Sequence, residues 1–217
     1  MSESREVRKR RRGHEAGSPP SGNWLNEMTP DSMTEWERLP DIGLYMDQVL
    51  TLVERQLAVY RRDQSDCIVT AAMVNNYIKD GLVPRAESKK YAPAHLALLL
   101  MIGTLKQVLS IPDIKRMISP CQDAQSAEQL YTHFLALQQD AFRETAELIA
   151  LAGLPDSKTD PAESKERLRR LALELVVEAR TRVLAAQRVL DMLDQPQVGP
   201  LPQAEPNQPK TEAPGLD

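Results

Sequence analysis

Two adjacent asparagines, Asn75 and Asn76, carry the side chains of this chain that best suit sequence-specific recognition. A carboxamide offers a donor and an acceptor together, and this combination matches the edge that adenine presents in the major groove of DNA. Basic and aromatic side chains follow nearby and suit contacts with backbone phosphates. The candidate DNA-contacting residues are Thr70, Asn75, Asn76, Tyr77, Lys79, Arg85, Lys89, Lys90 and Tyr91. Each of them taken alone is better explained by an ordinary solvated surface, and it is their order along the chain that favours recognition.

A short helix and a basic loop would position these side chains. Thr70 suits the N-cap of a helix that runs to Lys79. Asp80-Gly81 suits its end, because glycine tolerates the left-handed conformation found at helix C-termini. The segment 82–91 is expected to form a loop or a small hairpin. Helix, turn and basic loop in this order are typical of a helix-turn-helix with a wing, in which the second helix enters the major groove.

The neighbouring segments also predict helices. Between 42 and 60 apolar residues recur every three or four positions, which indicates one apolar helix face. The segment 94–109 is apolar on nearly all sides and follows Pro93, so we expect a central buried helix there. Ser110 and Asp113 form a capping-box pattern at the start of another short helix.

Two longer helices are expected towards the C-terminus. One covers about 126–151 and the other begins at Asp160-Pro161. The apolar stripe of the latter, 168–193, is interrupted by Arg182 and is not a clean heptad pattern. We therefore expect it to pack onto 126–151 within one chain, although a homodimer stays open because two-fold DNA sites favour dimers. Strand signal is weak throughout, and the predicted fold class is all-α.

Composition and charge set the domain organisation. Of the 217 residues, 41% are hydrophobic and only 4% aromatic, which suits a helical core of aliphatic side chains. The predicted divisions are a disordered basic arm (1–35), a first folded region (36–120), a helical region (121–194) and a disordered Pro-rich tail (195–217). The net charge of -4 does not by itself suggest nucleic-acid binding, but a local basic patch can bind DNA regardless of the total.

Catalytic and metal-dependent roles lack support in the sequence. The three histidines and two cysteines are widely spaced and form neither a metal-binding motif nor a disulfide framework. A glycine-rich phosphate loop is also missing. Cys67 is expected to be a small buried apolar residue rather than a reactive thiol. We expect no catalytic residues, no metal and no cofactor.

The cellular location follows from similar arguments. The longest apolar stretch, 96–105, is too short to cross a bilayer. Lone cysteines fit a reducing compartment, so a cytoplasmic protein with no membrane partner is expected.

The sequence TAAMVNNYIKDGLVPR, together with KKYAPAHLALLLMIGTLKQVLSIPDIKRMI downstream, resembles the DNA-binding head of MerR-type regulators. The positions that match the MerR-type pattern are Tyr77, Gly81-Leu82, Lys89, Tyr91 and His95-Leu96. The resemblance implies a winged helix-turn-helix head, double-stranded DNA as the partner, a dimerising helix after the head, and a role in transcription regulation. Asn75 and Asn76 depart from the pattern, because MerR-type helices carry an arginine just before their tyrosines.

A longer stretch, 39–118, is similar to a bacterial family known as domain of unknown function 1836. That family adds the upstream sequence LPDIGLYMDQVLTLVERQL at 39–57. Its name implies no activity, so DNA binding is expected only through the MerR-like resemblance. The alternative is a helical protein–protein interaction module that does not bind DNA, which the acidic net charge and the missing arginine favour.

Overall fold

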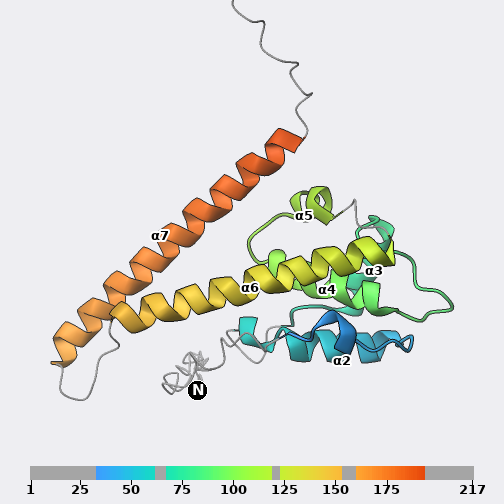
Figure 1. Ribbon diagram of the computed structural model, residues 1–217, viewed down its shortest axis with the longest axis horizontal. Helices are drawn as coiled ribbons and strands as arrows, with labels where there is room; N and C mark the ends of the chain where they lie inside the picture. The colour runs from blue at the N-terminus through green and yellow to red at the C-terminus, as the bar shows by residue number, and fades with distance from the viewer. Residues whose placement is uncertain (1–32, 62–66, 119–122, 153–159, 194–217) are drawn as a thin grey trace, which may run out of the picture.

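The computed structural model describes residues 33–61, 67–118, 123–152 and 160–193. Within these ranges the chain forms six α-helices, two 3₁₀ turns and no strand longer than an isolated bridge, so the predicted all-α class is confirmed (Figure 1). The helices are α2 (Met46–Gln56), α3 (Ala71–Lys79), α4 (Pro93–Leu105), α5 (Ile111–Ile118), α6 (Ala124–Ala152) and α7 (Pro161–Leu193). The 3₁₀ turns are η2 (Trp36–Arg38) and η3 (Ala58–Tyr60). The predicted basic arm and Pro-rich tail lie almost wholly outside the described residues.

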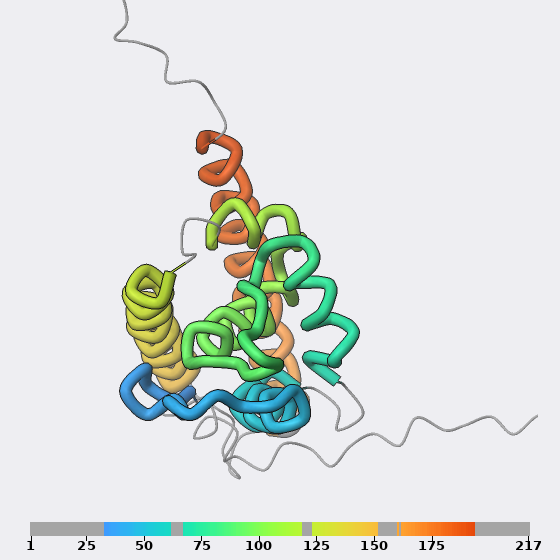
Figure 2. The backbone as a smooth tube through the Cα atoms, turned by 90° about the vertical axis from the view of Figure 1, so that its right-hand side faces the viewer, coloured from blue at the N-terminus to red at the C-terminus, as the bar shows by residue number. Residues whose placement is uncertain are grey.

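Helix α4 is the centre of the fold. Every residue from Leu96 to Ile102 is at most 1% exposed, as its uniformly apolar sequence predicts. Helices α2 and α6 pack against it, and Figure 2 shows α4 lying between them. Gly103 lets the side chain of Leu57 approach closely, since a Cβ at this position would overlap the Leu57 methyl group. The predicted start at Pro93 is confirmed, and Pro93 occupies the first turn.

Helix α2 begins later than the sequence predicts. The predicted helix covers 42–60, whereas α2 starts at Met46 and the last turn is a separate 3₁₀ turn. Leu44 stays extended because it pairs with Tyr91 in an antiparallel bridge. The Leu44 N–H donates to the Tyr91 carbonyl at 3.0 Å, and the Tyr91 N–H donates back at 2.8 Å. This long-range pairing joins the start of α2 to the segment before α4.

The segment around η2 is held against α6. The Tyr131 hydroxyl on α6 donates to the Thr34 carbonyl at 2.8 Å, and the ring centroids of Trp36 and Tyr131 lie 6.5 Å apart. Tyr131 is fully buried. The first part of α6 therefore belongs to the same hydrophobic core as α2, α3 and α4.

Helix α7 does not pack along α6, so the expected packing of 168–193 onto 126–151 is wrong. Figures 1 and 2 show the two helices separating from the end where they meet. The far end of α7 instead contacts α5, where the Arg116 guanidinium donates to the Leu190 carbonyl and lies 3.4 Å from the Asp191 carboxylate.

None of the helices in the described ranges combines the length and the apolar character that crossing a membrane requires.

Candidate nucleic-acid interface

Local sequence fixes both ends of α3. The Thr70 hydroxyl oxygen accepts a hydrogen bond from the Met73 N–H at 3.2 Å, which satisfies one of the free amides of the first turn. Gly81 has a φ of 72°, in the left-handed region. The predicted start and end of this helix are confirmed.

The two faces of α3 differ sharply. Val74 and Tyr77 point into the core and are 0% and 6% exposed, respectively. Asn75, Asn76 and Lys79 are exposed on the other side. The asparagines are therefore not buried in the core, and their carboxamides are accessible to a partner.

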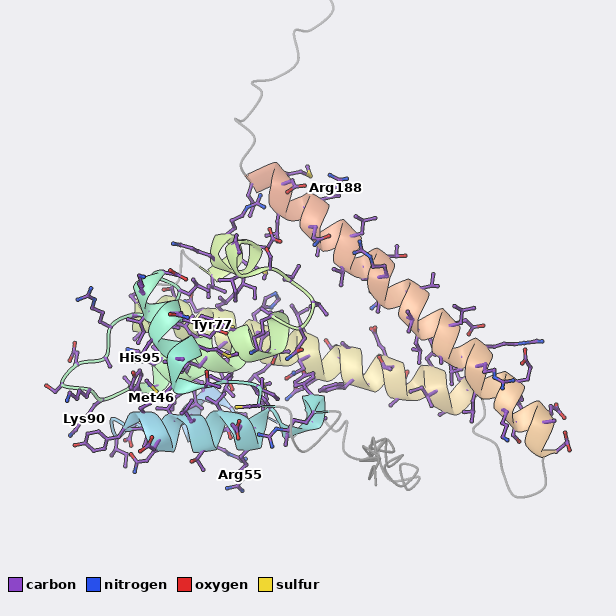
Figure 3. All side chains as sticks on the ribbon, turned by 180° about the vertical axis from the view of Figure 1, so that it is seen from behind. Met46, Arg55, Tyr77, Lys90, His95 and Arg188 are labelled. Carbon is purple, nitrogen blue, oxygen red and sulfur yellow. The ribbon has the colours of Figure 1, made fainter. Side chains whose placement is uncertain are left out.

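Tyr77 and Tyr91 lie in the core, although the sequence places them among the contact residues. Burial raises the pKa of both phenols above its ordinary value. Figure 3 shows Tyr77 on α3. Their burial indicates that the two rings hold α3 and the following segment in place.

A lysine on α5 supports the end of α3, and no sequence pattern predicts this contact. The ammonium group of Lys115 donates to the Asp80 carbonyl at 2.5 Å. Asp80 is the C-cap of α3, where the free carbonyls carry partial negative charge. Helix α5 itself begins with the predicted cap, in which the Ser110 hydroxyl donates to the Asp113 carboxylate at 2.7 Å and accepts the Asp113 N–H at 3.3 Å.

The segment 84–91 forms a tight turn, which we call the wing. The Lys90 N–H donates to the Glu87 carbonyl at 2.8 Å. Ser88 and Lys89 both have positive φ, at 49° and 62°, the pattern of a type I′ hairpin turn. The pairing of Tyr91 with Leu44 fastens the base of the wing to the body. The predicted loop or small hairpin is confirmed.

The cations of the wing lie on two sides of it. Arg85 and Lys90 line a surface hollow of about 570 Å³, which we call the wing–α4 hollow because Ala92, Ala94 and His95 also line it. Lys89 lines a different hollow, of about 420 Å³, with Tyr45 and Asp47. All three basic side chains are exposed, and Figure 3 shows Lys90 on the turn beyond the start of α2.

His95 has an unusual environment in the first turn of α4. Its Nδ1 accepts the Ala92 N–H at 3.0 Å, and its ring meets that of Tyr91 edge to face, with centroids 5.5 Å apart. The ring nitrogen Nε2 is buried and has no hydrogen-bond partner among the described residues. The sequence marked His95 only as the entry to a helix, because an unpaired ring nitrogen is a property of the tertiary structure.

Cys67 is exposed, which corrects the expectation of a buried residue. Its thiol donates to the Glu54 carboxylate at 3.0 Å, and this hydrogen bond is the main reason why the pKa of the thiol is raised. A raised pKa disfavours the reactive thiolate. Over the described ranges, no three histidine, cysteine or carboxylate side chains come together as a metal site.

Comparison with known proteins finds one family to which part of the chain is similar. Residues 34–134 match the model of a family described as Domain of unknown function (DUF1836). The match covers α2 to α5 and the first part of α6, and it includes every candidate contact residue. No curated protein and no solved structure matches the chain.

Proposed function

We propose that the segment shared with this family, 34–134, contains a MerR-like winged helix-turn-helix head that binds double-stranded DNA, and that the protein regulates transcription. In this proposal α2 and α3 form the helix-turn-helix, α3 enters the major groove, and the wing contacts the flanking backbone. The observation that carries it is the exposure of Asn75 and Asn76 on a helix whose opposite face is buried.

The support of α3 favours a recognition role. Reading base edges requires side chains on a rigid element, because a loosely held amide cannot discriminate between bases. Helix α3 is fixed by the Thr70 cap at one end and by Lys115 at the other. The backbone that carries the exposed asparagine carboxamides is therefore held in place.

The local charge supports phosphate contacts despite the acidic total. Lys79 and Lys115 lie at the end of α3, and Arg85, Lys89 and Lys90 lie on the wing, all exposed. Each cation that neutralises a phosphate releases condensed counterions, which makes binding strongly dependent on salt. The exposed asparagine carboxamides could therefore contact base edges, while the neighbouring cations contact the phosphates of the DNA backbone.

The test is binding of the full chain to a library of genomic fragments, followed by a salt series from about 50 to about 200 mM on selected duplexes. Replacing Asn75 and Asn76 by alanine is expected to remove discrimination between sequences, at about 1–3 kcal/mol for each lost bidentate contact. Lys79→Gln is expected to weaken binding to all duplexes equally and to lower the salt slope by about one.

Lys165→Gln, an exposed lysine on α7 outside the matched segment, is the control and should change neither property. Equal binding to every fragment, with the same salt slope in the Lys79 and Lys165 variants, would refute DNA recognition by this surface.

Self-association of the protein is a second proposed property, and the surface of α7 favours it. Leu173, Val176 and Val177 are exposed, with Leu173 as much as 65% accessible. Exposed apolar side chains grouped on one element are typical of interaction sites. We propose that this helix pairs with a second copy of the chain, which is compatible with the DNA-binding head, since two-fold sites call for dimers.

A further inference from the structure

We propose that the wing–α4 hollow binds a phosphate group, held by Arg85, Lys90 and the ring of His95. This inference deepens the proposed function and rests on it for one source of the phosphate, the backbone of DNA. A free phosphate anion presents the same chemistry, and the experiments below separate the two sources.

The buried donor of His95 is the first observation. The residue is only 8% exposed, and Nδ1 is occupied as an acceptor for the Ala92 N–H. In the neutral ring the proton must then be on Nε2, which makes this nitrogen a donor. No group in the part of the chain that the structure describes accepts it. Since buried donors are nearly always paired, an unpaired donor on a residue that lines a hollow indicates a place for an external acceptor.

The start of α4 is the second observation. Ala92 and Ala94 line the same hollow, and α4 has 13 residues, enough for a marked partial positive charge at its N-terminus. Pro93 has no N–H, and the amides of Ala92 and His95 are used within the first turn. This leaves the Ala94 amide without an acceptor among the described residues, and free first-turn amides are common ligands of phosphate.

The third observation is that the charged side chains lining the wing–α4 hollow include two cations and one carboxylate. Arg85 and Lys90 both line the hollow, and Glu87 is the single carboxylate among the described residues that do so. Gly43 lets Lys90 lie close to the body, because a Cβ on Gly43 would come within 2.7 Å of the Lys90 Cβ. An arginine, a lysine, an imidazole N–H and a backbone amide are several donors around one hollow, which suits the several oxygens of a phosphate better than a planar carboxylate.

Nuclear magnetic resonance on the full chain tests the site directly. The His95 ring signals, assigned by their loss in His95→Gln, are followed during titration with inorganic phosphate and, separately, with sodium chloride at matched ionic strength. Phosphate is expected to shift the His95 ring and the Ala94 amide, whereas chloride is not. Lys90→Gln should weaken phosphate binding by about fivefold or more, as expected for a lost charge-assisted hydrogen bond. Lys89→Gln is the matched control and should leave the affinity unchanged, because Lys89 lines the other hollow.

Two substitutions at His95 separate binding from folding. Glutamine and glutamate can both accept the Ala92 N–H from this position, as capping residues do. Glutamate also puts a negative charge into the hollow, so His95→Glu is expected to abolish phosphate binding while His95→Gln keeps part of it. Thermal unfolding of both variants shows whether each is folded, and equal phosphate affinity in two folded variants overturns the inference.

A short duplex then identifies the source of the phosphate. Loss of duplex affinity in His95→Glu and Lys90→Gln supports a DNA phosphate in the hollow. Duplex binding that neither variant changes, together with no response to inorganic phosphate, overturns the inference and leaves the DNA-binding proposal standing. A response to inorganic phosphate with no duplex binding by the native chain supports a small-anion site and overturns DNA binding instead.

Discussion

Gly81 is the residue on which the end of α3 depends. Its φ of 72° costs an ordinary L-residue about 1–2 kcal/mol. Gly81→Ala should therefore lower the free energy of unfolding by about that amount, measured by urea denaturation. Space is not the cause, because a Cβ at Gly81 would have only the Lys115 ammonium nearby, at 3.9 Å. Gly81→Asn should lose less, since asparagine tolerates this conformation, and an equal loss in both variants would contradict the backbone explanation.

Tyr131 should make the protein sensitive to alkaline pH. Burial raises the pKa of its phenol above the ordinary value, so the folded state holds the proton more tightly than the unfolded chain does. The resulting stability is complete below about pH 10, where the unfolded tyrosine is still protonated, and is lost as the pH rises further. One such group contributes a slope of at most about 1.4 kcal/mol per pH unit.

Tyr131→Phe should therefore flatten the decline in unfolding free energy above about pH 10. At neutral pH the same variant should be less stable by about 0.5–1.5 kcal/mol, because the hydrogen bond to the Thr34 carbonyl is lost. Urea denaturation across the alkaline range measures both effects. An unchanged alkaline slope in the variant would show that Tyr131 does not drive the decline.

A contact between α5 and α3 holds the last turn of α3. Lys115→Met removes the donor to the Asp80 carbonyl, so the last turn of α3 should open more often. A cation at a helix C-terminus contributes about 0.3–1 kcal/mol, which corresponds to about two- to fivefold faster amide hydrogen exchange in that turn. Lys115→Arg keeps the charge and should retain most of the protection. If the exchange of both variants equals that of the native chain, the contact does not support α3.

Sequence predicts an element well where its boundaries are set by local contacts. The caps at Thr70, Gly81 and Ser110 involve residues within three or four positions, and each is found where the sequence places it. The start of α2 could not be predicted in this way, because Leu44 is kept extended by Tyr91, far along the chain. The direction of α7 depends likewise on contacts with α5 that its own periodicity does not encode.

In the candidate interface too, some features follow from local sequence and others depend on tertiary contacts. The amides and cations were found from their residue types, and the asparagines are exposed as recognition requires. The burial of Tyr77 and the unpaired nitrogen of His95 depend on which elements surround them. Lys115 comes from a separate helix, so no spacing within 70–91 could have revealed it.

The two parts of the chain differ in how much apolar surface they bury. The core around α4 is closed, whereas α7 leaves several large apolar side chains accessible. Surface ion pairs such as Arg182 with Glu178, at 2.6 Å, contribute little to holding such a helix by itself. A long helix with few tertiary contacts is expected to open easily unless a partner covers it.

Pairing of α7 with a second copy should therefore appear as protection that depends on protein concentration. Amide exchange along α7 should slow as the concentration rises, because association stabilises only the covered helix, whereas exchange in α4 should stay constant. Replacing Leu173 and Val177 together by glutamate should remove this dependence and the dimer seen by sedimentation, since charge would be buried in the contact. Lys165→Glu changes the charge of α7 away from these side chains and should leave the dimer intact. Exchange along α7 that is the same at all concentrations would exclude self-association through this face, and the exposed side chains would then have to serve a different protein partner.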